Sequence, residues 1–152
     1  MKFSEMNYER PDVDELKAQI GALTERLRAA ESYGEAKDVF LERETLEKHV
    51  DTMGTLAHVR HSIDTRDEFY DAEMKFWDQA RPLLSESIQA WTKAMLEGKF
   101  RADFSAEYGD LMFINAEMEL KTFSPEIIPE LQKENELVTA YEKLLASAQI
   151  PF

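Results

Sequence analysis

The stretch that decides the architecture is YGEAKDVFLERETLEKHVDTMGTLAHVRHSI, residues 33–63. Ser32 and Glu35 at its start have the spacing of a helix-capping box. Apolar side chains recur at helical intervals and are predicted to face a core: Val39, Leu46, Val50, Met53, Leu56, Ala57 and Ile63. At about 1.5 Å per residue this helix is about 45 Å long, so it must lie beside other long helices. The stretch therefore predicts an elongated bundle.

The flanking stretches supply two further helices. Residues 12–30 carry one apolar stripe, and Asp12 is placed to cap the first turn, with Glu15 completing a second capping box. Residues 66–97 predict another long helix, and Thr65 and Glu68 have the capping-box spacing at its start. Pro82 lies inside it and predicts a bend near residues 78–82. The side chains expected to be buried in this third helix are Phe69, Phe76, Trp77, Leu84, Ile88, Trp91 and Met95.

The rest of the chain predicts shorter elements. Residues 100–108 indicate a connector with a short helical turn, and residues 110–121 a fourth helix that buries Leu111, Ile114 and Met118. Ser124 is expected to cap the last helix, with Pro125 in its first turn, but Pro129 leaves the start open: either residues 125–128 form a separate turn, or the helix restarts at Pro129. The helix continues to about Gln149 with Leu131, Val138, Tyr141 and Leu145. No stretch alternates as a strand does. We expect one all-α domain over residues 1–152, an elongated bundle of about five helices, two of them long, with a proline bend in the third.

Composition excludes several classes of protein. The chain has 31 acidic and 18 basic residues, a formal net charge of −13, and no cysteine. Disulfide scaffolds, thiolate metal sites and cysteine nucleophiles are therefore excluded, and binding to nucleic acid or anionic membranes is disfavoured. The N-terminal residues have no apolar leader segment, and no run of about 18 apolar residues occurs. We expect a cytoplasmic protein with no membrane and no nucleic-acid partner.

A search for catalytic motifs leaves only a weak metal candidate. His58 and His61 are three residues apart on one predicted helix and could share a metal. The zinc-peptidase motif His-Glu-x-x-His and the di-iron motif Glu-x-x-His are both absent. A helical-bundle metalloprotein that uses these histidines is therefore the least favoured interpretation of the sequence. We expect no catalytic residue and no metal ligand in this chain.

The segment RHSIDTRDEFY, residues 60–70, is the most unusual polar cluster. Charged side chains crowd the predicted corner between the two long helices. One reading is a corner stabilised by its own ion pairs. The other is a contact surface for a peptide carboxylate or another domain, with the candidate residues Arg60, His61, Asp64, Arg66 and Tyr70.

This corner resembles a known family. The run LAHVRHSIDTRDEFY (56–70), the opening FSEMNYERPD (3–12) and the late run LKTFSPEIIPEL (120–131) resemble the N-terminal region of oligoendopeptidase F, a family of zinc metallopeptidases related to thimet oligopeptidase. The resemblance implies a helical N-terminal domain that forms one wall of a channel for short peptides. In that family zinc is held by a His-Glu-x-x-His helix and a later Glu, outside the region matched here. The partners it implies are a downstream catalytic domain and short peptides, and the chain alone is expected to be inactive.

One alternative stays open at this stage. The chain could be a free-standing helical module that pairs with other proteins through its two long helices, without enzymatic activity. The sequence after Phe152 would separate the two readings. If the chain is the N-terminal part of a longer peptidase, we expect it to expose apolar surface when isolated, with self-association as a consequence.

Overall fold

The computed structural model describes residues 3–122 and 124–148, and within these ranges the chain forms helices and no strand. Its α-helices are α1 (Val13–Ala29), α2 (Tyr33–Ile63), α3 (Glu68–Glu97), α4 (Arg101–Tyr108), α5 (Leu111–Thr122) and α6 (Ile128–Ser147). Two short 3-10 helices, η1 (Phe3–Glu5) and η2 (Pro125–Ile127), complete the described part. The predicted all-α fold is confirmed. The helix count is six rather than about five, because residues 101–108 form a complete helix.

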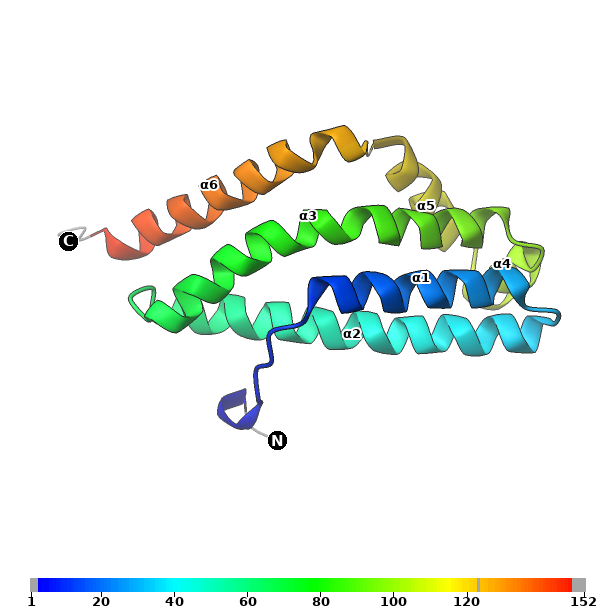
Figure 1. Ribbon diagram of the computed structural model, residues 1–152, viewed down its shortest axis with the longest axis horizontal. Coiled ribbons are helices and arrows are strands. Elements are labelled where there is room, and N and C mark those ends of the chain that lie inside the picture. The colour runs from blue at the N-terminus through cyan, green and yellow to red at the C-terminus, as the bar shows by residue number, and fades with distance from the viewer. Residues whose placement is uncertain (1–2, 123, 149–152) are drawn as a thin grey trace.

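Helix α3 lies at the centre of the bundle and contacts α1, α2 and α6. Figure 1 shows α1, α2 and α3 lying side by side, with α4 and α5 at one end and α6 along the far side of α3. The axis of α3 changes direction partway along its length in this view, in agreement with the bend predicted from Pro82. The arrangement is elongated, as the length of α2 predicts.

Local side-chain contacts set where the helices begin. The Asp12 side chain accepts hydrogen bonds from the backbone N–H groups of Asp14 and Glu15, and Ser32 accepts one from Glu35, as predicted. The third helix differs: its cap is Asp67, not Thr65, so α3 begins at Glu68. At the other end of the chain, η2 is the separate turn and α6 begins directly after it at Ile128, while the Ser124 side chain makes no capping hydrogen bond. Residue 149, the predicted end of the last helix, lies outside the described residues.

Two buried clusters hold the long helices together. One lies near α4 and α5 and includes Leu23, Val39, Trp91, Phe104 and Phe113. The other lies toward the α2–α3 corner and consists of Met53, Leu56, Ala57 and Trp77. Most of the apolar stripes predicted for residues 12–97 thus face a core.

Several predicted core residues are instead exposed. Ile63 at the end of α2 is 74% exposed, and Phe69 at the start of α3 is also outside. In α5 the residues Leu111, Ile114 and Met118 are exposed, and Phe113 is the residue that it buries. In α6 no residue is buried, and Val138, Tyr141 and Leu145 face outward. The predictions for α5 and α6 were wrong because these helices lie at the edge of the bundle, and those for Ile63 and Phe69 were wrong because these residues lie at the helix ends that flank the α2–α3 turn.

One glycine has a conformational role. Gly109, between α4 and α5, has a φ of +89°, which side chains rarely adopt, so it lets the chain turn there. Among the described helices, none is both long and apolar enough to cross a membrane.

Candidate functional site

The α2–α3 corner contains all five residues singled out in the sequence. α2 ends at Ile63 and α3 begins at Glu68, and the backbone N–H of Asp67 donates to the carbonyl of Asp64 at 3.1 Å. The two long helices therefore meet in a tight turn, at the left of Figure 1. The turn brings Arg60 and Tyr70 together and places Asp64 and Arg66 outside.

Arg60 faces inward and binds the N-terminal segment. Its guanidinium donates to the Tyr70 hydroxyl at 2.7 Å and to the backbone carbonyls of Met6 and Phe3. It also lies 5.5 Å from the ring centre of Phe3 and 5.6 Å from that of Tyr70, within the range of cation–π attraction. Arg60 and Tyr70 thus attach the first residues of the chain to the corner.

Asp64 and Arg66 form the outer part of the corner. An Asp64 carboxylate oxygen accepts hydrogen bonds from the backbone N–H of Arg66 at 3.0 Å and from its Nε at 3.2 Å. These two bonds lower the pKa of Asp64 below its ordinary value. The Arg66 side chain is 90% exposed, so its remaining N–H groups point to solvent and are available to a partner.

His61 is buried and does not join His58. Its Nε2 lies 3.7 Å from an Asp71 carboxylate oxygen and has no hydrogen-bond partner among the described residues. Asp71 is bound by Lys143 at 2.5 Å and Lys75 at 2.9 Å, and these hydrogen bonds lower its pKa to about 2. His58 is exposed, so the two histidines that the sequence paired face different environments.

The residues missed in the sequence are those that hold the N-terminal strap, residues 3–12. Glu73 on α3 accepts hydrogen bonds from the Tyr8 hydroxyl and from the Arg10 guanidinium, whose Nε lies 3.0 and 3.1 Å from the two carboxylate oxygens. The Tyr8 hydroxyl in turn accepts a bond from Trp77 Nε1 at 3.1 Å. The strap is therefore fixed across the α2–α3 end of the bundle by a network around one carboxylate.

Burial and hydrogen bonding act oppositely on this network. The Glu73 side chain is only 3% exposed. Burial raises the pKa of Glu73, but the bonds from Arg10 and Tyr8 together outweigh it and leave the pKa below its ordinary value. Burial, together with the bond to Glu73, raises the pKa of Tyr8. A signal was present in the sequence: Glu73 shares the buried stripe of α3 with Trp77, Leu84 and Trp91, where a charge needs a partner.

Close packing supports the same end of the bundle. A Cβ added at Gly54 of α2 would lie 3.0 Å from an Arg81 nitrogen and 3.7 Å from the Trp77 ring. Arg81 itself lies 5.7 Å from the centre of that ring. The small residue on α2 thus makes room for Trp77 and Arg81 on α3.

A buried arginine lies elsewhere, beside a hollow of about 340 Å³ between α2, α3 and α5. Arg43 donates to Glu47 at 3.1 Å, and its Nε has no partner among the described residues. Glu44 and Glu119 line the same hollow. Because three carboxylates surround one guanidinium, this hollow does not favour an anionic ligand.

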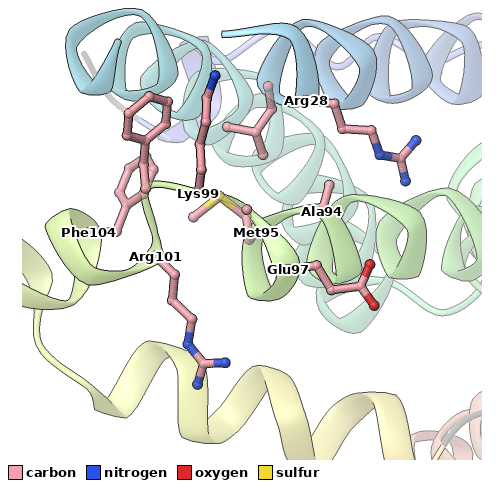
Figure 2. Close-up of a pocket in the computed structure, with 10 residues that line it drawn as sticks. Arg28, Ala94, Met95, Glu97, Lys99, Arg101 and Phe104 are labelled. Carbon is pink, nitrogen blue, oxygen red and sulfur yellow. The ribbon is translucent and has the colours of Figure 1, made fainter. Parts of the chain in front are cut away.

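A second hollow, also of about 340 Å³, lies where α3 ends and α4 begins. Its floor is apolar and includes Met95 and Phe104. Figure 2 shows that the side chains of Arg28, Lys99 and Arg101 diverge around it, and Arg101 reaches Glu117 of α5 at 2.7 Å. Polar groups do not converge on one point here, so the hollow lacks the arrangement that a catalytic site needs.

The described residues also do not fit a zinc site. In residues 3–122 and 124–148, no three His, Cys, Asp or Glu side chains come together as metal ligands. His61 has Asp71 beside it, but that carboxylate already binds two lysines. What this part of the molecule provides is a set of contacts that anchor the N-terminal strap and the α2–α3 corner.

Comparison with known proteins gives a consistent result. The sequence model of the peptidase M3 N-terminal domain matches residues 3–123. No protein with a curated description matches the chain. Three solved structures are similar over 99–100% of the chain: PZ peptidase A with an inhibitor (38% identity, TM-score 0.94), a protein named as an oligoendopeptidase F from Bacillus anthracis strain Ames (37%, 0.95), and a second oligoendopeptidase F (39%, 0.95). The chain spans 27–28% of the length of these structures.

Proposed function

The chain belongs to the peptidase M3 N-terminal domain family, and from this membership we propose that it is the non-catalytic N-terminal domain of an oligoendopeptidase F-like peptidase. The proposed whole protein hydrolyses short peptides with zinc, which is held outside this chain by a downstream catalytic domain. The observation that carries the proposal is the similarity of the entire chain to little more than a quarter of each solved peptidase.

The role we propose for this domain is to form one wall of the channel that admits peptides. The support is its shape: α2 and α3 have 31 and 30 residues and lie side by side, which gives one long rigid surface. A wall of this kind selects substrates by size, because a folded protein cannot enter between it and a facing domain.

Within the corner we propose a division of roles. Arg60, His61 and Tyr70 have internal neighbours and hold the corner together. Asp64 and Arg66 face outward, so they are our candidates for contact with a peptide or with the catalytic domain. Because Asp64 neutralises part of the Arg66 charge, we expect this contact to add little affinity by itself.

A domain exchange tests the proposed function. The region of the Bacillus anthracis protein that matches this chain is replaced by residues 1–152, and a short internally quenched peptide is offered to the chimaera with zinc. We expect hydrolysis of the peptide, no hydrolysis of a folded protein, and no hydrolysis by the isolated chain. The matched control is the same Bacillus anthracis protein without the region that matches this chain.

Two results would contradict the proposal. Metal-dependent cleavage by the isolated chain would show that it is not a purely supporting domain. A folded chimaera that leaves the peptide intact, while the unmodified Bacillus anthracis protein cleaves it, would remove the proposed role. Sequencing the gene beyond codon 152 distinguishes the peptidase domain from the free-standing helical module. A reading frame that continues to a His-Glu-x-x-His motif supports a peptidase, and an immediate stop codon supports the module.

The cytoplasmic setting expected from the sequence stays a prediction. Fractionation of cells that make the protein at its natural level tests it, with activity and protein both expected in the soluble cytoplasmic fraction.

A further inference from the structure

The outer face of α6 is an apolar surface without a neighbour in the described part of the chain. It consists of Leu137, Val138, Tyr141, Leu144 and Leu145, which recur at the spacing of one helical face and are 51–65% exposed. A hollow of about 460 Å³ is lined by Leu137, Val138 and Tyr141 and bordered by Glu130, Lys133 and Glu134. A helix with five such residues normally turns them toward a core.

The opposite side of α6 contacts α3 through polar groups. Lys143 binds Asp71, Thr139 donates to an Asp78 carboxylate oxygen at 3.1 Å, and Asn135 donates to the Asp78 backbone carbonyl at 3.2 Å. Gln79 of α3 makes two more hydrogen bonds to α6. Its side chain donates to Glu136 at 2.6 Å, and its backbone carbonyl accepts from the Gln132 side chain at 3.1 Å. The polar side of α6 therefore faces the bundle and its apolar side faces away, the reverse of a helix that completes a core.

The comparisons show that proteins with the same helix have a much longer chain. The family sequence model ends at residue 123, before α6, whereas the structural similarity covers 99–100% of the chain and so includes α6. Nearly three-quarters of each of those peptidases lies outside the matched region. Each of those proteins thus has far more chain than this bundle, and that chain is available to cover a helix face that this bundle leaves open.

Charge argues against a second copy of this chain as the occupant. Each copy carries a formal charge of −13, so two identical faces would approach against mutual repulsion. The border of the face contains two glutamates and one lysine. The occupant that fits is an apolar surface bordered by basic side chains.

We propose that the outer face of α6 is the surface on which the remaining part of the peptidase chain docks, through an apolar patch with basic residues at its border. The proposal rests on the proposed function, because it takes the occupant from the same polypeptide. α6 then acts as a link whose polar side binds the N-terminal bundle and whose apolar side binds the rest of the protein.

Hydroxyl-radical footprinting of the chimaera described above tests this docking directly. The oxidation rates of Tyr141 and Leu144 are measured by mass spectrometry in the isolated chain and in the chimaera. Leu41 on α2 is the matched control, since it is an exposed leucine in the layer farthest from α6. We expect oxidation of Tyr141 and Leu144 to slow by about fivefold or more in the chimaera, because interface centres exclude water, with Leu41 unchanged.

Variants sharpen the same experiment. In the chimaera, Leu144→Lys is expected to restore fast oxidation of Tyr141, and Leu41→Lys is expected to leave it slow. Peptide hydrolysis is measured on the same samples, so the two proposals can fail separately. Protection of α6 without hydrolysis supports the docking and contradicts the proposed function. Hydrolysis with an unprotected α6 supports the proposed function and contradicts the docking.

The isolated chain provides a test that does not need the chimaera to fold. The exposed apolar surface alone predicts self-association, but the charge of −13 on each copy opposes it. We therefore expect Tyr141 to be oxidised at the same rate across the micromolar range, with a monomer in sedimentation. Protection of Tyr141 that grows with concentration and disappears in the Leu144→Lys variant would assign the face to a second copy. That result would overturn the proposal.

Discussion

Helices α1, α2 and α3 and helix α6 all carry apolar side chains, but they direct them in opposite ways. α1, α2 and α3 turn apolar residues toward one another and bury Leu23, Leu56 and Trp77. α6 turns polar residues toward α3 and leaves its apolar side exposed. The difference teaches that a helical apolar stripe shows that a face will be covered, and says nothing about which part of the protein covers it.

The largest expected effect on the free energy of unfolding comes from a substitution in the buried core between α2 and α3. Trp77→Ala removes a buried indole and its bond to Tyr8, and we expect it to cost about 3–5 kcal/mol in the free energy of unfolding. Leu137→Ala on the outer face of α6 is the matched comparison and should change that free energy by less than about 0.5 kcal/mol. Urea denaturation of the isolated chain measures both. A cost above 1 kcal/mol for Leu137→Ala would show that α6 is already covered in the isolated chain.

The next effect concerns the buried carboxylate that holds the strap. Glu73→Gln removes the charge that binds Arg10 and Tyr8, and we expect a loss of about 2 kcal/mol, less than for a fully buried pair because Arg10 is half exposed. Glu136→Gln on α6 is the control and should be nearly neutral. Thermal unfolding followed by circular dichroism gives the ranking, and equal losses for the two variants would refute the structural importance assigned to the strap.

Asp71 allows the α3–α6 contact to be examined by pH. Its pKa falls from an ordinary value of 3.8 to about 2, because Lys143 and Lys75 bind the charged form. A lowered folded-state pKa means that the stabilisation is present above about pH 4 and is lost as the pH falls toward 2. We expect Asp71→Asn to cost about 1–2 kcal/mol at pH 7, reduced by the exposure of both lysines, and almost nothing at pH 2. Denaturation of both proteins at the two pH values tests this, and a cost that does not depend on pH would exclude the ion pairs as its source.

The prediction from sequence succeeded where helices pack on two sides. The stripes of residues 12–97 identified the long helices and most of their buried residues, and Asp12 and Ser32 identified two of the starts. It failed for Ile114 and Tyr141, because helical periodicity cannot tell whether a neighbour lies in this chain or beyond it. The corner residues were singled out by their charge density and stay candidates, whereas the strap network was missed, since Tyr8 and Glu73 are 65 positions apart.

The smallest expected effect is confined to the polar side of α6. Thr139→Val removes one hydrogen bond to Asp78, whose other carboxylate oxygen has no partner among the described residues. We expect a cost of about 1 kcal/mol, and a further rise in the pKa of Asp78, which burial already raises. Amide hydrogen exchange should show faster exchange in α6 and unchanged exchange in α2. Uniform acceleration in both helices would mean that α6 does not open independently of the bundle.

The N-terminal strap also has a consequence for how the chain reaches its native state. Its contacts with Glu73 and Trp77 join residues 63 to 69 positions apart, whereas most contacts in a helical bundle are local. During synthesis the strap leaves the ribosome before α3, yet it has no partner until the middle of α3 has followed. The strap is therefore expected to dock late, as the step that closes a long loop onto helices already formed. Docking of the strap is therefore expected only after the α2–α3 corner has formed.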